Sequence, residues 1–253
     1  MEALLRKPAP AVGLAATALF LAGPAAAQSW ETQRDETQNV TMAVGTWPGG
    51  YAVAARCQAG DFQLIVRLPE PVSSGGIPYI QFEDQSRVMF LSLPYGAETG
   101  RLLFAQEPAR AARWLLGGGQ LAFTTSDVES VALALPADGE PVRVALRACD
   151  RPEVDARDDL PSAGPIQWRR RPVPAWPEEA DAGIRNALVT LSCLVEADGR
   201  LRDCRAERET PPGQGFAEAA ITAARRGALE PFSGQELVVG GVARFSMGFS
   251  LEE

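Results

Sequence analysis

VTLSCLVEADGRLRDCRAERETPPGQGFAEAAITAARR, residues 189–226, places Asp198-Gly199 between two strand-like segments that each contain one cysteine. An Asp-Gly dipeptide in this position is the strongest short-range signal for a β-hairpin. If these two residues form the whole turn, Cys193 lies directly opposite Cys204, on the same face and within disulfide distance. A one-residue bulge at Gly199 would instead put the two thiols on opposite faces. The stretch therefore predicts a disulfide-closed hairpin, provided that the turn has no bulge.

A helix and a long terminal strand follow the hairpin. Residues 216–226 have an apolar stripe of small side chains, while Glu218 near their start and Arg225 near their end complement the helix dipole. Residues 242–251 alternate between apolar and polar or small side chains, which predicts a half-buried strand. The apolar face carries Ala243, Phe245, Met247, Phe249 and Leu251, and the other face carries Arg244, Ser246, Gly248 and Ser250.

Residues 172–253 contain these elements in a specific order. Pro174-x-Trp176-Pro177-x-x-Ala180 comes first, followed by the strand LVTLSCLV, the Asp-Gly turn, a return strand, the helix PPGQGFAEAAITAARR and the strand ARFSMGFSL. This order resembles the C-terminal domain of the TonB energy-transducer family. The resemblance implies a compact α/β domain whose last strand lies at a sheet edge. In that family this strand pairs with an extended segment, the TonB box, at the periplasmic face of an outer-membrane transporter.

The terminal strand is the expected binding site, because a long strand without proline offers backbone donors and acceptors to an added strand. The expected peptide-binding positions are Val242, Arg244, Ser246, Gly248 and Ser250. The expected partner is a protein of the cell envelope, and the resemblance implies a TonB-dependent transporter of the outer membrane. A homodimer through the same edge is an alternative. The edge would be closed if residues 237–239 or a second copy already cover it.

Residues 28–150 predict a separate β-rich, sandwich-like domain with one or two helices. Residues 62–68 alternate in polarity, and helical spacing occurs at 108–116 and 142–149. Further strand-like runs lie at 51–56, 77–83, 87–93, 120–125 and 128–135. Cys57 and Cys149 are the two cysteines of this part, and in an exported protein they are expected to form a disulfide.

Residues 151–171 predict a linker between the two domains. They contain three prolines and nine charged residues, with almost no apolar periodicity, so they are expected to stay solvated. The cluster of Asp155, Asp158 and Asp159 lacks the ligand spacing of an EF-hand, and no metal site is predicted there.

Residues 1–27 predict a cleavable export signal. Arg6 and Lys7 precede an apolar stretch at 12–22, and small residues follow at 24–27. The sequence therefore predicts an exported, periplasmic α+β protein in four parts: signal 1–27, β-rich domain 28–150, linker 151–171 and TonB-like domain 172–253. A mature chain that begins near Gln28 would favour a soluble module, whereas an intact N-terminus would favour an anchor in the inner membrane.

The composition limits the possible chemistry. The chain has no His, its single Lys is at position 7, and its formal net charge is −8 at pH 7. These features exclude Ser-His and Cys-His nucleophile pairs, exclude lysine-based catalysis in the mature chain, and argue against nucleic acid as a partner. Catalytic residues, metal ligands and cofactors are therefore not predicted. The leading hypothesis is a peptide-binding module. One alternative is an energy transducer, although the long Pro-rich spacer of that family is not found in this sequence. The other alternative is an exported carboxylate-based enzyme.

Overall fold

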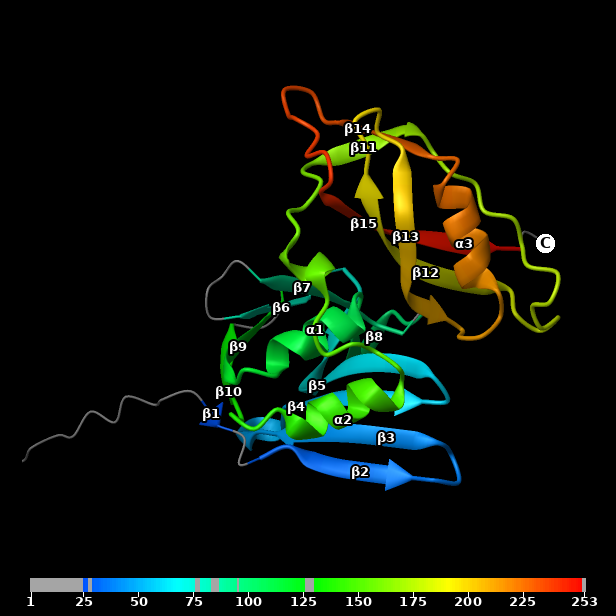
Figure 1. Cartoon of the computed structure of the whole chain (residues 1–253). Helices are drawn as coiled ribbons and strands as arrows, with labels where there is room; N and C mark the ends of the chain where they lie inside the picture. Colours follow the sequence, from blue (N-terminus) through cyan, green and yellow to red (C-terminus); the bar gives the residue numbers. More distant parts are fainter. Residues whose placement is uncertain are drawn as a thin grey trace, which may run out of the picture.

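The computed structural model describes residues 25–26, 29–75, 78–82, 87–94, 96–125 and 130–251. These residues form a mixed structure, mostly of β-strands, so the predicted α+β class is confirmed at this level (Figure 1). Their buried apolar side chains gather in two cores, one from residues 30–149 and one from residues 163–249. The expected export signal lies outside the described residues except for Ala25–Ala26. No helix in the described ranges is long and apolar enough to cross a membrane.

The first core lies against a ten-stranded sheet in the order β1-β10-β9-β6-β7-β8-β5-β4-β3-β2. Its strands are β1 (Ala25–Ala26), β2 (Glu31–Asp35), β3 (Val40–Thr46), β4 (Ala52–Gln58), β5 (Asp61–Ser73), β6 (Tyr79–Phe82), β7 (Val88–Ser92), β8 (Thr99–Ala105), β9 (Gly119–Thr124) and β10 (Val131–Leu135). Neighbouring strands are paired without a break, so the expected sandwich of two facing sheets is wrong. The alternation pattern predicts β4 to β7, β9 and β10. It misses β2 and β8, which carry runs of exposed residues, and β3, which alternates only in its second half.

Two helices cover one face of this sheet, where helical spacing predicts them. α1 (Pro108–Leu115) contacts β5, and α2 (Glu140–Ala148) contacts β3 and β4. Cys149 at the end of α2 is bonded to Cys57 of β4, with Cα atoms 5.5 Å apart, so this predicted disulfide is confirmed. Trp47 directly follows β3, and its indole nitrogen donates to the carbonyl of Ala134 in β10 at 2.8 Å, although six strands lie between β3 and β10 in the sheet order. The sheet is therefore strongly curled.

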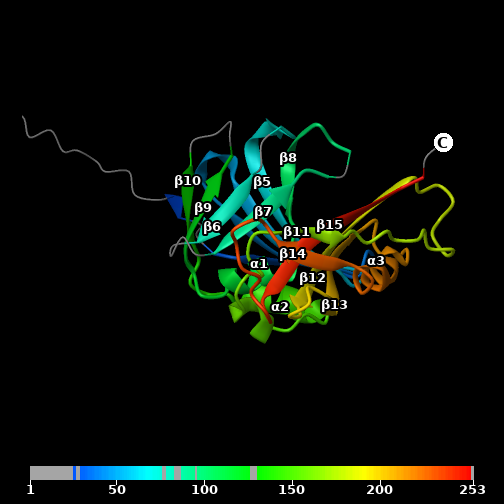
Figure 2. The same ribbon diagram turned by 90° about the horizontal axis from the view of Figure 1, so that it is seen from above.

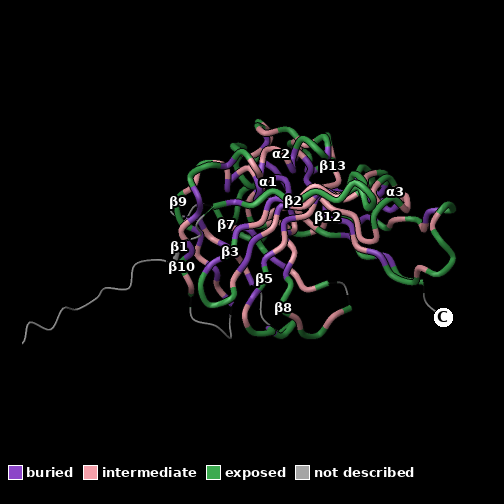
Figure 3. Tube along the Cα trace, turned by 90° about the horizontal axis from the view of Figure 1, so that it is seen from below, coloured by how far each residue is buried: buried purple, intermediate pink, exposed green. Residues whose placement is uncertain are grey.

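The second core lies between a three-stranded sheet and α3 (Phe216–Ala224). The strands are β12 (Asn186–Val195), β13 (Leu201–Thr210) and β15 (Val242–Ser250), in the order β13-β12-β15. α3 lies on one side of this sheet in both views (Figures 1 and 2). A second, two-stranded sheet pairs β11 (Ile166–Arg170) with β14 (Ala228–Pro231). Buried positions alternate with intermediate or exposed ones along β4 and β5, whereas the central strand β12 has five buried residues in a row (Figure 3).

The turn of the β12–β13 hairpin differs from the two-residue turn that the sequence predicts. The N–H of Glu196 donates to the carbonyl of Arg200 at 2.9 Å, so three residues form the loop. Gly199, the last of them, has φ of 78°, a conformation that favours glycine. Val195 consequently pairs with Leu201, whereas a two-residue turn would have paired it with Arg202. The register near the turn is therefore shifted by one residue.

A second irregularity restores the register before the cysteines. Asp203 has φ of 48° and is an extra residue in β13, so that Ser192 again opposes Arg205. Cys193 and Cys204 are bonded, with Cα atoms 4.1 Å apart. The predicted disulfide is confirmed, but the expected regular hairpin is wrong: two bulges with opposite effects bring the thiols together.

The expectation that residues 151–171 form a solvated linker is also wrong. The short helix η2 (Ala156–Asp159) holds Arg157, which is only 7% exposed, and Ala163 is fully buried in the second core. Residues 166–170 form β11. Asp155 and Asp158 of this segment form ion pairs with Arg113, which comes earlier in the chain, and Asp155 also pairs with Arg205 of β13. Residues 151–171 are hereafter called the joining segment, between the first block (residues 28–150) and the second block (residues 172–253).

Candidate functional site

β15 forms one edge of the three-stranded sheet. It pairs with β12 along its whole length, from Ser250 opposite Asn186 to Val242 opposite Leu194. The N–H and C=O of Val242 point away from β12, because they bond to Pro161 and Ala163 of the joining segment. In an antiparallel strand every second residue points the same way. Arg244, Ser246, Gly248 and Ser250 therefore direct their backbone groups outward too.

These outward backbone groups are free to form hydrogen bonds with an added strand. Among the residues that the structure describes, none provides a backbone partner on this side for Arg244, Ser246 or Gly248. Ser246, Gly248 and Ser250 are exposed, and a Cβ built on Gly248 would have open space around it. Residues 244–250 are hereafter called the β15 edge.

Val242 does not belong to the open edge, which corrects the sequence-based expectation. Its side chain is fully buried, and Ser162 forms a parallel bridge beside it. The N–H of Val242 donates to Pro161 at 2.8 Å, and its carbonyl accepts from Ala163 at 3.1 Å. The segment at 237–239, which could have covered the edge, bonds to the joining segment instead, through Val238. The open edge thus begins at Arg244.

The face of β15 that carries its odd-numbered residues packs on the second core and anchors the strand. Ala243, Met247 and Phe249 are buried, as the alternation predicts. The ring of Phe249 packs edge-on against Phe216 of α3, with centroids 4.9 Å apart, and Phe245 packs in the same way against Trp168 at 5.0 Å. Because these rings hold the strand from one side, its edge is fixed in position.

Two hollows flank the β15 edge. A cleft of about 730 Å³ lies between the first block and the start of β15, where α1, β7 and η2 form its other walls. A smaller groove of about 230 Å³ lies between residues 171–174 and the backbone at 246–248. Hollows therefore border the start and the middle of the edge.

A row of alternating charges, hereafter the ion chain, lines the cleft and joins the blocks. Its members in order are Arg244, Glu107, Arg110, Asp158, Arg113, Asp155 and Arg205. Arg244 contacts Glu107 at 2.6 Å, and Arg113 donates to Asp158 at 2.8 Å. Burial raises the pKa of the Glu107 carboxyl, and the charges of Arg244 and Arg110 oppose that rise. The side chain of Arg244 is thus occupied by the first block, while its backbone faces the open edge.

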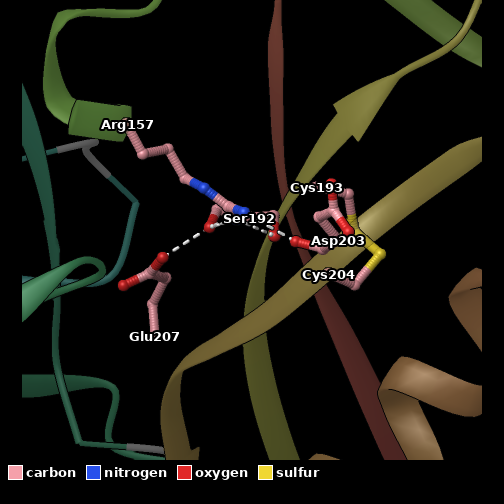
Figure 4. Close-up of a disulfide and its surroundings, with 6 residues drawn as sticks. All are labelled: Arg157, Ser192, Cys193, Asp203, Cys204 and Glu207. Carbon is pink, nitrogen blue, oxygen red and sulfur yellow. Dashed lines mark hydrogen bonds between the residues drawn. A yellow bond between two sulfur atoms is a disulfide. The ribbon is translucent and has the colours of Figure 1, made fainter. Parts of the chain in front are cut away.

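Arg157 reaches from η2 to the back of the hairpin, close to the disulfide (Figure 4). Its guanidinium donates to the carbonyl and hydroxyl of Ser192, both at 3.0 Å, and to the carbonyl of Asp203 at 2.7 Å. The hydroxyl of Ser192 in turn donates to Glu207. Arg157 therefore satisfies the carbonyl of the bulged residue that sets the cysteine register.

No family model, curated protein or solved structure matches this chain. The functional argument therefore rests on the geometry of the β15 edge and the cleft. Within the described ranges, no three His, Cys, Asp or Glu side chains are grouped so as to hold a metal ion.

The sequence predicts the β15 edge but not the cleft. Glu107 and Arg244 are 137 residues apart, and no local pattern connects them. The acidic run of the joining segment was the one available signal, since Asp155 and Asp158 both belong to the ion chain. A hydrated linker would leave these two carboxylates unpaired, whereas in the structure both form ion pairs.

Proposed function

We propose that this protein is an exported, periplasmic binding module of the TonB C-terminal type, which takes up an extended peptide segment along the β15 edge. The proposed partner is an envelope protein with a TonB-box-like segment, such as an outer-membrane transporter. The order of hairpin, helix and terminal strand supports this proposal. So does the position of β15 at the outside of its sheet.

The open β15 edge is the observation that carries the proposal. Sheet edges are usually protected from pairing with other chains by charged side chains. β2, at the end of the first sheet, has three charged residues among five, and β13, at the far edge of the second, has six among ten. β15 has one, Arg244, whose side chain is bound to Glu107. The β15 edge therefore lacks the protection that these other two edges have.

Strand addition fits the chemistry of this edge. The backbone of an added peptide would bond to the outward groups of Arg244, Ser246 and Gly248, and its alternate side chains would meet the two flanking hollows. The joining segment already makes one parallel bridge of this kind at Val242. Because aromatic contacts and the hairpin hold β15 in place, little ordering of the protein would oppose binding.

The test removes one backbone donor from the edge. Random peptides displayed on phage are selected on the full chain, and their affinities are then measured for Ser246→Pro. Proline has no N–H and obstructs an added strand at this point, so affinity should fall at least about tenfold. Ser246→Thr, which keeps the N–H, and Ser233→Pro, in an exposed turn, should bind within about twofold of the unmodified protein.

The fold of each variant is checked by circular dichroism. The proposal is wrong if a folded Ser246→Pro variant binds the selected peptides as well as the unmodified protein does. It is equally wrong if the unmodified protein selects no peptides.

A further inference from the structure

We propose that a second hollow between the two blocks, hereafter the β13 groove, binds a small organic carboxylate through Arg208. The groove has a volume of about 400 Å³, and small-molecule sites have volumes of roughly 300–1,000 Å³. The end of β7 and the loop after it form much of one wall, and Leu188 of β12 with Arg208 and Thr210 of β13 forms the other. The inference is independent of strand addition, because none of the described residues that line the groove belongs to β15.

The walls of the β13 groove carry a positive charge. Among the described residues that line it, Arg208 is the only charged one, so no carboxylate in these walls neutralises the guanidinium. Further polar groups are the hydroxyls of Ser92 and Thr210 and the side-chain amide of Gln106, all of which can donate hydrogen bonds. A ligand complementary to this lining carries a negative charge.

Arg208 has no ion-pair partner in the part of the chain that the structure describes. Burial lowers the pKa of its guanidinium, and the charge of Asp61 acts in the opposite direction. Asp61 lies outside the β13 groove, where its carboxylate accepts a hydrogen bond from Gln63. A partly buried cation without a close counter-ion is costly, and an anion beside it would offset that cost.

The guanidinium of Arg208 is held in place and has donors to spare. It lies over the ring of Phe104, 4.9 Å from the centroid, and this stacking limits the freedom that it would lose on binding a ligand. Its Nη1 donates to the hydroxyl of Ser92 at 3.3 Å. Its Nε and Nη2 have no hydrogen-bond partner among the described residues, yet both keep accessible surface. Because the Ser92 oxygen accepts from Arg208, its own hydrogen can point at the same ligand.

The ligand class follows from one cation and apolar surroundings. A single carboxylate would balance the charge of Arg208 and can accept two hydrogen bonds from a guanidinium. Leu91 and Leu93 on one wall and Leu188 on the other give the groove apolar surface on both sides. Burial of that surface against a short alkyl chain would add affinity. The ligand is therefore a short-chain monocarboxylate that lies between the two blocks.

The experiment titrates the full isotope-labelled chain with hexanoate and follows it by NMR. The backbone amide signals of Ser92 and Thr210 report on opposite walls of the groove, so both should shift along one saturation curve. Hexanol and hexylamine, which lack the carboxylate, should give no saturable shift. Acetate has the carboxylate without the apolar body and should bind at least about tenfold more weakly than hexanoate.

Variants at two positions test the role of Arg208, with the Thr210 signal as the readout. Arg208→Lys keeps the charge but cannot form the two-pronged contact, so its affinity should fall at least about tenfold. Ser92→Asp places a carboxylate beside Arg208 and should abolish the saturable shift. Ser92→Asn, its neutral counterpart, should bind within about threefold of the unmodified protein. Arg101→Met, an exposed arginine paired with Glu70 outside the groove, should bind within about twofold.

Thermal unfolding separates loss of the site from loss of the fold. Because the new carboxylate pairs with Arg208, Ser92→Asp should unfold at a temperature no lower than Ser92→Asn does. The proposal is overturned if hexanoate gives no saturable shift, or if its affinity is unchanged in Arg208→Lys or in Ser92→Asp. Acetate that binds as tightly as hexanoate would contradict the apolar part of the site.

Discussion

Arg157 and Asp155 connect the joining segment to the second block. Asp155 caps the start of η2: its carboxylate accepts a hydrogen bond from the backbone N–H of Arg157 and contacts Arg205 at 3.0 Å. This leaves the guanidinium of Arg157 directed at the hairpin, where it bonds to the carbonyl groups of Ser192 and Asp203. Two charged residues, two positions apart, therefore help to order a segment whose composition predicts disorder.

Asp155 should make the stability of the protein depend on pH. Burial acts to raise its pKa, but the N–H of Arg157 and the charges of Arg205 and Arg113 act more strongly, and the pKa is lowered. A carboxyl group with a lowered pKa stabilises the fold above its unfolded pKa, and that contribution is lost as the pH falls through the folded value. Asp155→Asn should therefore reduce the unfolding free energy by about 1 kcal/mol at neutral pH. The reduction should be smaller well below the pKa of an ordinary aspartate.

Urea denaturation at the two pH values measures this difference. Asp159→Asn, which changes an exposed carboxylate of the same helix, is the matched control. The same loss at both pH values for Asp155→Asn would contradict the role assigned to its charge.

At the scale of elements, the hairpin and β15 depend on each other. β12 is the central strand and pairs with both β13 and β15. The three-residue turn and the bulge at Asp203 cancel, and the disulfide closes just beyond them. On its other side β12 pairs with β15 without a register shift, and this pairing fixes which backbone groups of β15 face outward.

The two disulfides should differ in their contribution to stability. Cys193 and Cys204 are 11 residues apart, whereas Cys57 and Cys149 are 92 apart. In the chain-entropy model, removal of the disulfide that closes the short loop lowers the unfolding free energy by about 3 kcal/mol, and removal of the other lowers it by about 5 kcal/mol. The difference arises because a disulfide that closes a longer loop restricts the unfolded chain more. Urea denaturation of the two Cys→Ala double variants compares them. Equal costs, or the reverse order, would contradict this expectation.

At the scale of the whole molecule, the two blocks meet through charged groups rather than through apolar surface. The ion chain joins α1 to η2, β13 and β15. Elsewhere along the interface, Arg208 of β13 lies over the ring of Phe104, 4.9 Å from its centroid, and donates to Ser92 at 3.3 Å. Because the joining segment also contributes to the second core, the boundary at residue 171 does not coincide with the edge of that core.

A fragment of residues 155–253 should therefore be more stable than one of residues 172–253. The shorter fragment lacks the fully buried Ala163, the Trp168 ring against Phe245, and the bonds from Arg157 to the hairpin. Their combined loss should lower the unfolding free energy by about 3 kcal/mol. Urea denaturation of both fragments tests this, and a fragment of residues 163–253 isolates the share of Arg157. Equal stability of the longest and shortest fragments would show that the joining segment contributes nothing.

The sequence by itself determined the features that depend on neighbours along the chain. Residues two apart in a strand, or three and four apart in a helix, must share a face, so alternation at 242–251 and spacing at 108–116 were enough to place β15 and α1. The pairing of the four cysteines followed because each block contains two. The common face of Arg244, Ser246, Gly248 and Ser250 could be predicted for the same local reason.

Only the tertiary structure decided the features that depend on distant residues. Single-residue bulges change a register without leaving a periodic signal, so the compensation at Gly199 and Asp203 could not be predicted. Whether a charged segment is hydrated or ordered depends on the charges it meets, and Asp158 meets Arg113, which lies 45 residues earlier. Val242 is closed to peptides because Pro161 and Ala163 reach it from about 80 residues away. The cleft exists for the same physical reason: the fold brings together charges that the sequence keeps apart.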